Sequence, residues 1–306
     1  MSYHIVNIDS PQCYISCSKG QLICKENGGV VKSLPLEDVA AIVITSFSAS
    51  LHSKLLLESA RIGVSLIICE RFQPVSLLLP ANRSSDTLLT KAALNLPKKT
   101  TEGLWRKTID AKCKNQALLA EYLDAEHDKL ESLRVASRRR VADKESVCAR
   151  HYWQIFRDYL RVPDFRRTRD GGGVNDLLNF GYAVLLSLIL QKLFAYGLDP
   201  TLGISHEVRE RATPLAYDLM EPFRPCVDYR VARWATEECG TDQYHVNAAF
   251  RRYVTEFTLE RVGYFNLEMP LKNCIESVIY SFRKAVMSGQ IREYKPWTPS
   301  NSKWDG

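Results

Sequence analysis

The sequence predicts an α+β protein in which a small β-rich domain precedes a larger all-α domain. Apolar runs of strand length, separated by turn residues, fill the first 80 residues, and apolar residues at helical spacing dominate from residue 104 onward. A polar, turn-rich stretch at residues 80–86 separates the two patterns. We therefore expect a β-rich domain over residues 1–82, a helical domain over 83–290 and a tail, partly ordered, over 291–306.

The β-rich part contains six runs of strand length. They occupy residues 4–8, 14–18, 21–24, 40–44, 64–69 and 75–79. Lys19-Gly20 lies between the second and third runs and is typical of a hairpin turn. Ser50-Leu-His-Ser opens a short helix over residues 55–61, and Gly63 stands where a helix end favours left-handed backbone. The last two runs are expected to be buried strands.

The second part contains six segments with helical spacing of apolar residues. They cover residues 104–127, 147–159, 177–197, 215–238, 248–262 and 271–287. Residues 177–198 are long enough to cross a membrane, but Lys192 near one end favours a buried core helix, because a charge in a bilayer is costly. The N-terminus lacks a basic region followed by an apolar stretch, so we expect neither a signal peptide nor a membrane partner.

Charge and cysteine content restrict the class of protein. The formal net charge is +6, which permits nucleic acid as a partner without indicating it. Nine cysteines occur without a CxxC pair, which argues against a zinc cluster or a disulfide framework. Free thiols in a reducing cytoplasm are the simpler expectation.

The segment from Asp218 to Asp228 is the strongest local signal for chemistry. Asp218 and Glu221 are three residues apart, so a helix would point both carboxylates to one side, and His206 lies upstream. Two carboxylates and a histidine suit Mg²⁺ or Mn²⁺ better than zinc. Taken alone, the segment is more typical of a solvated helix face on which Glu221 pairs with Arg224.

Glu145 and the arginines are ambiguous one by one. A glutamate at a helix start commonly serves the helix dipole. Arginine clusters flank both Glu145 and the segment from His206 to Glu221, and arginine binds phosphate in a bidentate manner. The clustering around the same candidate ligands favours a phosphodiester substrate over solvated charged faces.

Taken together, these motifs resemble the CRISPR-associated protein one family, the integrase of CRISPR adaptation. The resemblance rests on five motifs in the family's order, which span most of the chain. They are Trp105 with Ala111-Lys112 and Asn115-Gln116, then Glu145 with Ala149, Tyr152 and Trp153, then Asn175 with Phe180-Gly181-Tyr182-Ala183, then Leu202-Gly203-Ile204-Ser205-His206, and last Asp218-Leu-Met-Glu221-Pro-Phe-Arg-Pro-Cys-Val-Asp228. The last motif resembles the form found with type II systems.

The resemblance implies a metal-dependent DNA integrase. Glu145, His206 and Glu221 would be catalytic and hold Mg²⁺ or Mn²⁺, and Asp218 would assist them. The 3′-hydroxyl of a short captured DNA, the prespacer, would attack a phosphodiester at the edge of a CRISPR repeat. The implied assembly is a homodimer built by the β-rich domain, paired across CRISPR-associated protein two in a heterohexamer that other adaptation or effector proteins could join. Contacts to the DNA backbone are expected from Arg138, Arg139, Arg140, Arg166, Arg167 and Arg224.

Two other functions use the same residues. A metal-dependent, structure-selective endonuclease would cut branched DNA with water as the nucleophile and would join nothing. A DNA-binding scaffold with a decayed site is the non-enzymatic alternative, and the intact Glu145, His206 and Glu221 argue against it.

Overall fold

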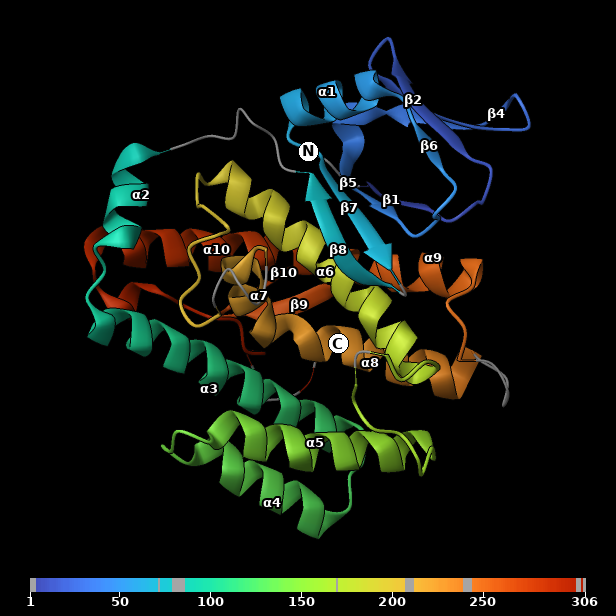
Figure 1. Ribbon diagram of the computed structural model, residues 1–306. Coiled ribbons are helices and arrows are strands. Elements are labelled where there is room, and N and C mark those ends of the chain that lie inside the picture. The colour runs from blue at the N-terminus through green and yellow to red at the C-terminus, as the bar shows by residue number, and fades with distance from the viewer. Residues whose placement is uncertain are drawn as a thin grey trace.

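Eight short strands between residues 4 and 78 build two four-stranded sheets, at the upper right of Figure 1. The computed structural model describes residues 4–70, 72–78, 86–168, 170–206, 212–238, 244–300 and 304. The strands are β1 (His4–Ile8), β2 (Tyr14–Ser18), β3 (Gln21–Glu26), β4 (Gly29–Pro35), β5 (Val39–Ile44), β6 (Ser50–Leu51), β7 (Ser65–Glu70) and β8 (Gln73–Leu78). One sheet has the order β1-β5-β7-β8, and the other has the order β4-β3-β2-β6.

Two local predictions in this region are confirmed. Lys19 and Gly20 have φ angles of 49° and 74° and close the antiparallel β2–β3 hairpin. Helix α1 (Ser53–Ile62) begins after His52, whose Nδ1 accepts a hydrogen bond from the Lys54 amide, and ends at Gly63 with φ 90°.

The first sheet is buried on both faces at its central strand β5, and this strand joins the β-rich part to the helical part. β1, β5 and β7 are parallel, and every residue of β5 is buried. Ile42 and Ile44 belong to a core shared with the second sheet, whereas Val43 and Ile67 belong to the core of the helical part. Helix α6 (Val174–Ala195) packs against β5, β7 and β8 of this sheet.

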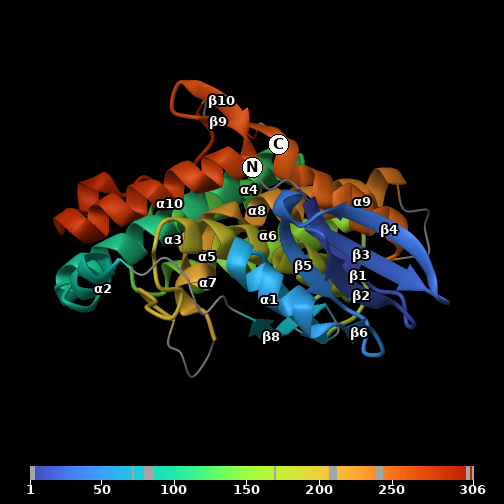
Figure 2. The same ribbon diagram turned by 90° about the horizontal axis from the view of Figure 1, so that it is seen from above.

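Ten helices in the described part of the chain carry most of the remaining architecture, as Figures 1 and 2 show. Besides α1 and α6 they are α2 (Thr87–Leu94), α3 (Lys98–Tyr122), α4 (His127–Arg138), α5 (Lys144–Leu160), α7 (Pro214–Met220), α8 (Arg224–Arg233), α9 (Ala248–Glu256) and α10 (Leu271–Ser288). Short helical turns add η1 (Leu36–Asp38), η2 (Glu221–Phe223), η3 (Trp234–Glu238), η4 (Phe257–Leu259) and η5 (Ile291–Glu293).

Helix α6 is the centre of the helical core. It is the one described helix long and apolar enough to cross a membrane, yet 89% of its most apolar window is buried inside the protein. This burial agrees with the predicted core helix. Gly181 lets α8 approach closely, because a Cβ at this position would lie 2.4 Å from Cγ1 of Val227.

Two prolines interrupt one helix that the sequence predicts as continuous. The sequence predicts one continuous helix over residues 215–238, but α7 ends at Met220, and η2 separates it from α8. Pro222 and Pro225 lack the amide that a continuous helix would need at these positions. Glu221 is therefore the first residue of a tighter 3-10 turn and no longer belongs to the α-helix that carries Asp218.

Three further expectations are wrong. β8 is an edge strand with Val75 59% exposed, so it is not a buried strand. The predicted helix over residues 248–262 ends at Glu256, and an antiparallel hairpin follows, β9 (Arg261–Tyr264) and β10 (Leu267–Pro270), within a second part that is mostly helical as expected. The segment after Ile291 buries Tyr294 and Trp297 in the core instead of extending from it.

The predicted boundary at residues 80–86 lies outside the described residues apart from Asp86. The division of the chain at residue 82 therefore stays a prediction.

Candidate active site

Three helical segments meet at one buried lysine. Lys112 is in the middle of α3, Glu145 is in the first turn of α5, and Glu221 opens η2. The Lys112 Nζ lies 2.6 Å from Oε1 of Glu145 and 2.6 Å from Oε2 of Glu221. Two of the predicted ligands, 76 positions apart in the sequence, therefore face the same point in space.

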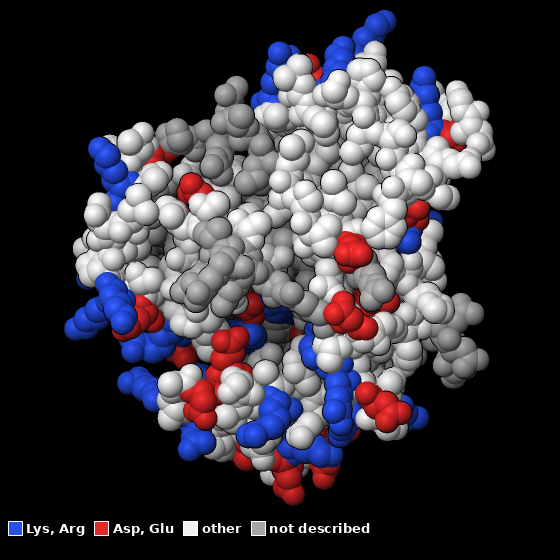
Figure 3. Space-filling model, in the orientation of Figure 1, with Lys and Arg blue, Asp and Glu red and all other residues white. Residues whose placement is uncertain are grey.

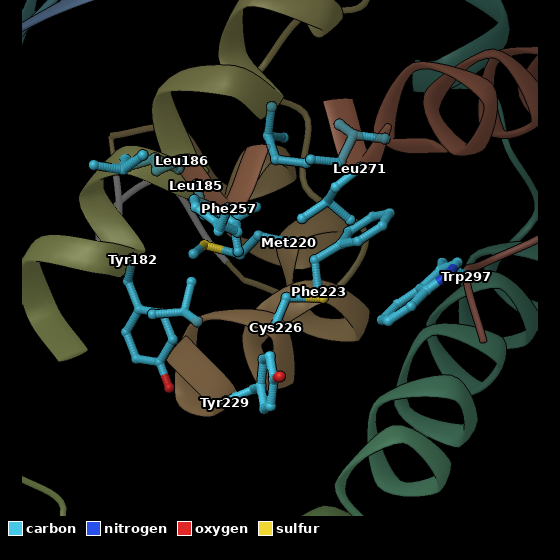
Figure 4. Close-up of a cluster of buried hydrophobic side chains, with 14 of the residues drawn as sticks. Tyr182, Leu185, Leu186, Met220, Phe223, Cys226, Tyr229, Phe257, Leu271 and Trp297 are labelled. Carbon is cyan, nitrogen blue, oxygen red and sulfur yellow. The ribbon is translucent and has the colours of Figure 1, made fainter. Parts of the chain in front are cut away.

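The break between α7 and α8 fixes Glu221 in place. Asn115 of α3 donates hydrogen bonds from Nδ2 to the carbonyls of Pro222, at 2.8 Å, and Trp297, at 3.0 Å. The rings of Phe223 and Trp297 stack with centroids 5.6 Å apart, and Figure 4 shows them face to face at the edge of the buried cluster. The Glu221 side chain is consequently only 5% exposed, whereas that of Glu145 is 40% exposed and opens toward solvent.

Two cations keep Glu221 ionised. Burial opposes its ionisation, but the Arg224 guanidinium and the Lys112 ammonium outweigh burial and lower the pKa of Glu221 to about 2. The Arg224 Nε lies 2.8 Å from Oε1 of Glu221. Burial likewise opposes the charge of Lys112, and Glu221 with Glu145 outweighs it, so the pKa of Lys112 is raised.

A third carboxylate, that of Asp218, positions His206. Asp218 of α7 is fully buried, and its Oδ1 lies 2.6 Å from Nδ1 of His206. The other oxygen, Oδ2, accepts hydrogen bonds from the amides of Ile204, at 2.7 Å, and Ser205, at 3.0 Å. The hydrogen bond with Asp218 raises the pKa of His206 against the effect of burial, and the charge of Glu221 adds to the rise.

This pairing leaves one nitrogen of His206 for another task. A carboxylate can only accept, so Nδ1 of a neutral His206 carries the proton and Nε2 keeps its lone pair. The ring also meets the edge of Trp105, with centroids 5.9 Å apart. Gly203 is required in the preceding turn, because a Cβ there would lie 2.5 Å from the carbonyl oxygen of His206.

The four predicted acidic and histidine residues thus form two linked pairs. Glu145 and Glu221 share Lys112, Asp218 holds His206, and the charge of Glu221 reaches the imidazole. Within the described residues, no three His, Cys, Asp or Glu side chains already form a metal-binding group. The alternative of a solvated face is wrong for Glu221, which does pair with Arg224 but is buried.

The predicted arginines fall into two groups. Arg167 and Arg224 are inside, and both lie over the Tyr182 ring, with Cζ 5.4 Å and 4.5 Å from the ring centroid. Arg167 also donates hydrogen bonds to the side chains of Asn175 and Asn179. By contrast, Arg138, Arg139, Arg140 and Arg166 are exposed. Of the interior pair, Arg224 also contacts the proposed ligand Glu221, and the exposed group faces solvent.

A basic groove runs beside the site. It has a volume of about 580 Å³ and lies between α3, α4 and the start of α5. Its lining includes Asp110, Lys114, Glu121, Arg134, Arg138, Arg140 and Lys144. In the view of Figure 3, Lys and Arg gather with Asp and Glu over the lower part of the face, where α3, α4 and α5 lie in Figure 1, while the β-rich upper part is largely uncharged.

Comparison with known proteins identifies the relatives of this chain. The family model described as "CRISPR associated protein Cas1" matches residues 6–257. A protein of Neisseria meningitidis named "CRISPR-associated endonuclease Cas1" is 28% identical over 288 residues, which cover 92% of this chain and 91% of the relative.

Solved structures share the fold at low sequence identity. A casposase bound to integration product is 19% identical with a TM-score of 0.72, over 97% of this chain and 96% of its own. A chain of a Cas6-RT-Cas1–Cas2 complex is 16% identical with a TM-score of 0.74, over 96% of this chain and 36% of its own.

Proposed function

The chain belongs to the Cas1 family, and on that premise we propose that it is a metal-dependent DNA integrase of CRISPR adaptation. The reaction proposed is a transesterification that joins the 3′-hydroxyl ends of a short captured DNA to the repeat array. The observation that carries the proposal is the convergence of Glu145 and Glu221, from separate helices, on one cation beside a histidine held by a buried aspartate.

The residues of this site suit Mg²⁺ or Mn²⁺. The carboxylates of Glu145 and Glu221 and Nε2 of His206 would hold the ion, since hard cations favour oxygen ligands and Mn²⁺ also accepts imidazole. Oε2 of the buried Glu221 makes no aligned hydrogen bond within the described residues, although the Lys112 ammonium lies beside it. When bound, such an ion offsets charge on the phosphodiester and lowers the pKa of the attacking hydroxyl.

The surrounding residues prepare the ligands. Asp218 fixes the ring orientation and tautomer of His206. Arg224 holds one oxygen of Glu221, so that the other oxygen stays directed at the cation position. The exposed arginines Arg138 and Arg140 line the groove between α3, α4 and α5, and we assign them to phosphate contacts.

The proposed partners are DNA and a second protein. The casposase relative is described as bound to integration product, and another relative as part of a Cas1–Cas2 complex. We propose that this chain binds a prespacer duplex and a leader-repeat DNA, forms a homodimer through its β-rich part, and assembles with CRISPR-associated protein two.

A cutting activity without joining is the second candidate. The Neisseria relative is named an endonuclease, and a water molecule in place of the 3′-hydroxyl would turn the same site into a hydrolase. The nucleophile is not part of the protein, so only an experiment with defined DNA ends separates the two reactions.

A strand-transfer assay tests the proposal. Labelled short duplexes with free 3′-hydroxyls are incubated with Mn²⁺, the partner protein, and a supercoiled plasmid that carries a leader and a repeat. We expect label in the plasmid, and its loss with Glu221→Gln, with His206→Ala and with EDTA. Ser281→Ala on α10 is the matched control, because its buried hydroxyl bonds to the Val278 carbonyl and the Lys295 amide rather than to a proposed ligand, so joining should stay intact.

Two other outcomes would contradict the proposal. Plasmid cut without incorporation of label would identify an endonuclease. Equal DNA binding by all variants, with no reaction in any of them, would identify a scaffold.

A further inference from the structure

The ammonium of Lys112 already occupies a cation position. Its Nζ lies 2.6 Å from an oxygen of Glu145 and 2.6 Å from an oxygen of Glu221, and the lysine side chain is only 11% exposed. Lys112 comes from α3, whereas its two partners come from α5 and η2, so the ammonium is the contact that all three segments share.

A divalent ion bound by these two carboxylates would meet that ammonium. The two oxygens are no more than 5.2 Å apart, because each lies 2.6 Å from the same nitrogen. A bond from Mg²⁺ to a carboxylate oxygen is shorter than the 2.6 Å contact of the ammonium, at about 2.0–2.1 Å. A metal that touches both oxygens would thus lie within a few ångströms of Nζ, where two cations repel each other strongly in a buried site.

We propose that Lys112 is a resident counter-cation, which holds Glu145 and Glu221 together in the metal-free protein and must leave for the metal to bind. Lys112 is then a positioning residue that sets metal affinity by competition. The inference rests on the proposed function, because it assumes that Glu145 and Glu221 are metal ligands.

The surroundings allow the ammonium to leave. The Glu145 side chain is 40% exposed, so the site is open on that side. The flexible four-carbon side chain of Lys112 can change rotamer and carry the ammonium out through this opening. Glu221 would keep Arg224 on its other oxygen, at 2.8 Å, and would not become an unpaired buried charge. The exchange therefore replaces one cation with another at the two carboxylates that they share.

Lys144 provides a matched control. It is the neighbour of Glu145 in sequence, its side chain is 10% exposed, and it forms an ion pair with Asp110 instead of a proposed ligand. Lys112→Met and Lys144→Met each remove one buried positive charge from the same region. A general electrostatic effect would act through both variants, whereas competition for the site would act through Lys112 alone.

Calorimetric titration with Mn²⁺ on the full chain tests the inference. We expect Lys112→Met to bind Mn²⁺ about tenfold more tightly than wild type, because the binding-competent state no longer has to expel a cation. Its metal-free melting temperature should fall, and added Mn²⁺ should restore it. Lys144→Met should keep the wild-type affinity. Unchanged or weaker binding by Lys112→Met, or equal tightening in both variants, would overturn the inference.

A measurement on the wild-type chain covers the case in which Lys112→Met does not fold. Lysine acetylation with a reactive ester is followed by peptide mass spectrometry, with and without Mn²⁺. We expect labelling of Lys112 to rise several-fold with the metal while that of Lys144 stays constant. Constant labelling of Lys112 at saturating Mn²⁺ would overturn the inference.

Glu221→Gln separates this inference from the proposed function. If Glu221→Gln and wild type bind Mn²⁺ equally well, the proposed ligands are wrong and the inference fails with them. If Glu221→Gln abolishes binding while Lys112→Met leaves it unchanged, the ligands stand and only the role of Lys112 is refuted.

Discussion

Replacing Asp218 with asparagine tests whether this residue controls His206. Asn has the same shape but offers one acceptor oxygen instead of two. In wild type, Oδ2 accepts from the amides of Ile204 and Ser205, and Oδ1 accepts from the amide of His206, at 3.3 Å, and faces its Nδ1 at 2.6 Å. Either orientation of the new amide would set an NH₂ group against two donors in a fully buried position.

The magnitude follows from those contacts. A hydrogen bond to a charged group contributes about 1.5–3 kcal/mol, and a buried donor without a partner costs about 1–3 kcal/mol. With two donors affected, we expect Asp218→Asn to lower the free energy of unfolding by about 3 kcal/mol or more. His206 would also lose the acceptor that fixes its tautomer, which typically weakens metal binding about 10–100-fold.

Urea unfolding and Mn²⁺ titration measure the two effects separately. Ser281→Ala is the control, because it disturbs a buried hydroxyl on α10 that bonds to the Val278 carbonyl and the Lys295 amide. It should cost about 1 kcal/mol without changing Mn²⁺ affinity. If Asp218→Asn loses stability but keeps wild-type Mn²⁺ affinity, then His206 does not act through the nitrogen that Asp218 leaves free, and the reasoning is refuted.

Three other variants test the packing, the electrostatics and the groove. Gly181→Ala should lower the free energy of unfolding by about 1–3 kcal/mol in urea melts, because its Cβ would meet Val227, and wild-type stability would contradict the close α6–α8 approach. Burial raises the pKa of Asp228 to about 6, above its unfolded value, so ionising it costs stability as the pH rises from about 4 to about 6. Asp228→Asn should therefore gain about 3 kcal/mol relative to wild type over that interval, and a pH-independent difference would refute this. The double variant Arg138→Ser, Arg140→Ser should bind duplex DNA with a shallower slope of log affinity against log salt concentration, by up to about two. A slope equal to that of wild type would exclude these arginines from phosphate contact.

Much of the fold was predictable because its signals are local. Lys19-Gly20 reports a turn, Gly63 a helix end, and the apolar run of α6 a core helix, each from neighbouring residues. The two errors in the helices have different causes. Pro222 and Pro225 divide α7 from α8, and this was a local signal that the predicted helix over residues 215–238 ignored. The β9–β10 hairpin, which turns at Phe265 with a φ of 54°, replaces the end of the helix predicted over residues 248–262, and there tertiary context decides.

The site was predictable in part. Glu145, His206 and Glu221 each stand in a recognisable motif, but nothing local indicates that two of them share a lysine. Lys112 is 33 residues from Glu145 in sequence, and it stands within a helix where a lysine is ordinarily solvated. The pattern Ala111-Lys112 with Asn115-Gln116 was the available signal, because all four side chains prove to be buried on α3.

The most direct test of the account is a crystal structure of the chain crystallised with Mn²⁺. An anomalous difference map from these crystals locates the bound ion. We expect one strong anomalous peak in contact with Glu145, Glu221 and Nε2 of His206, with the Lys112 ammonium moved away from both carboxylates. A map without a peak there at saturating Mn²⁺, with Lys112 still between Glu145 and Glu221, would contradict the metal site on which the proposed function depends.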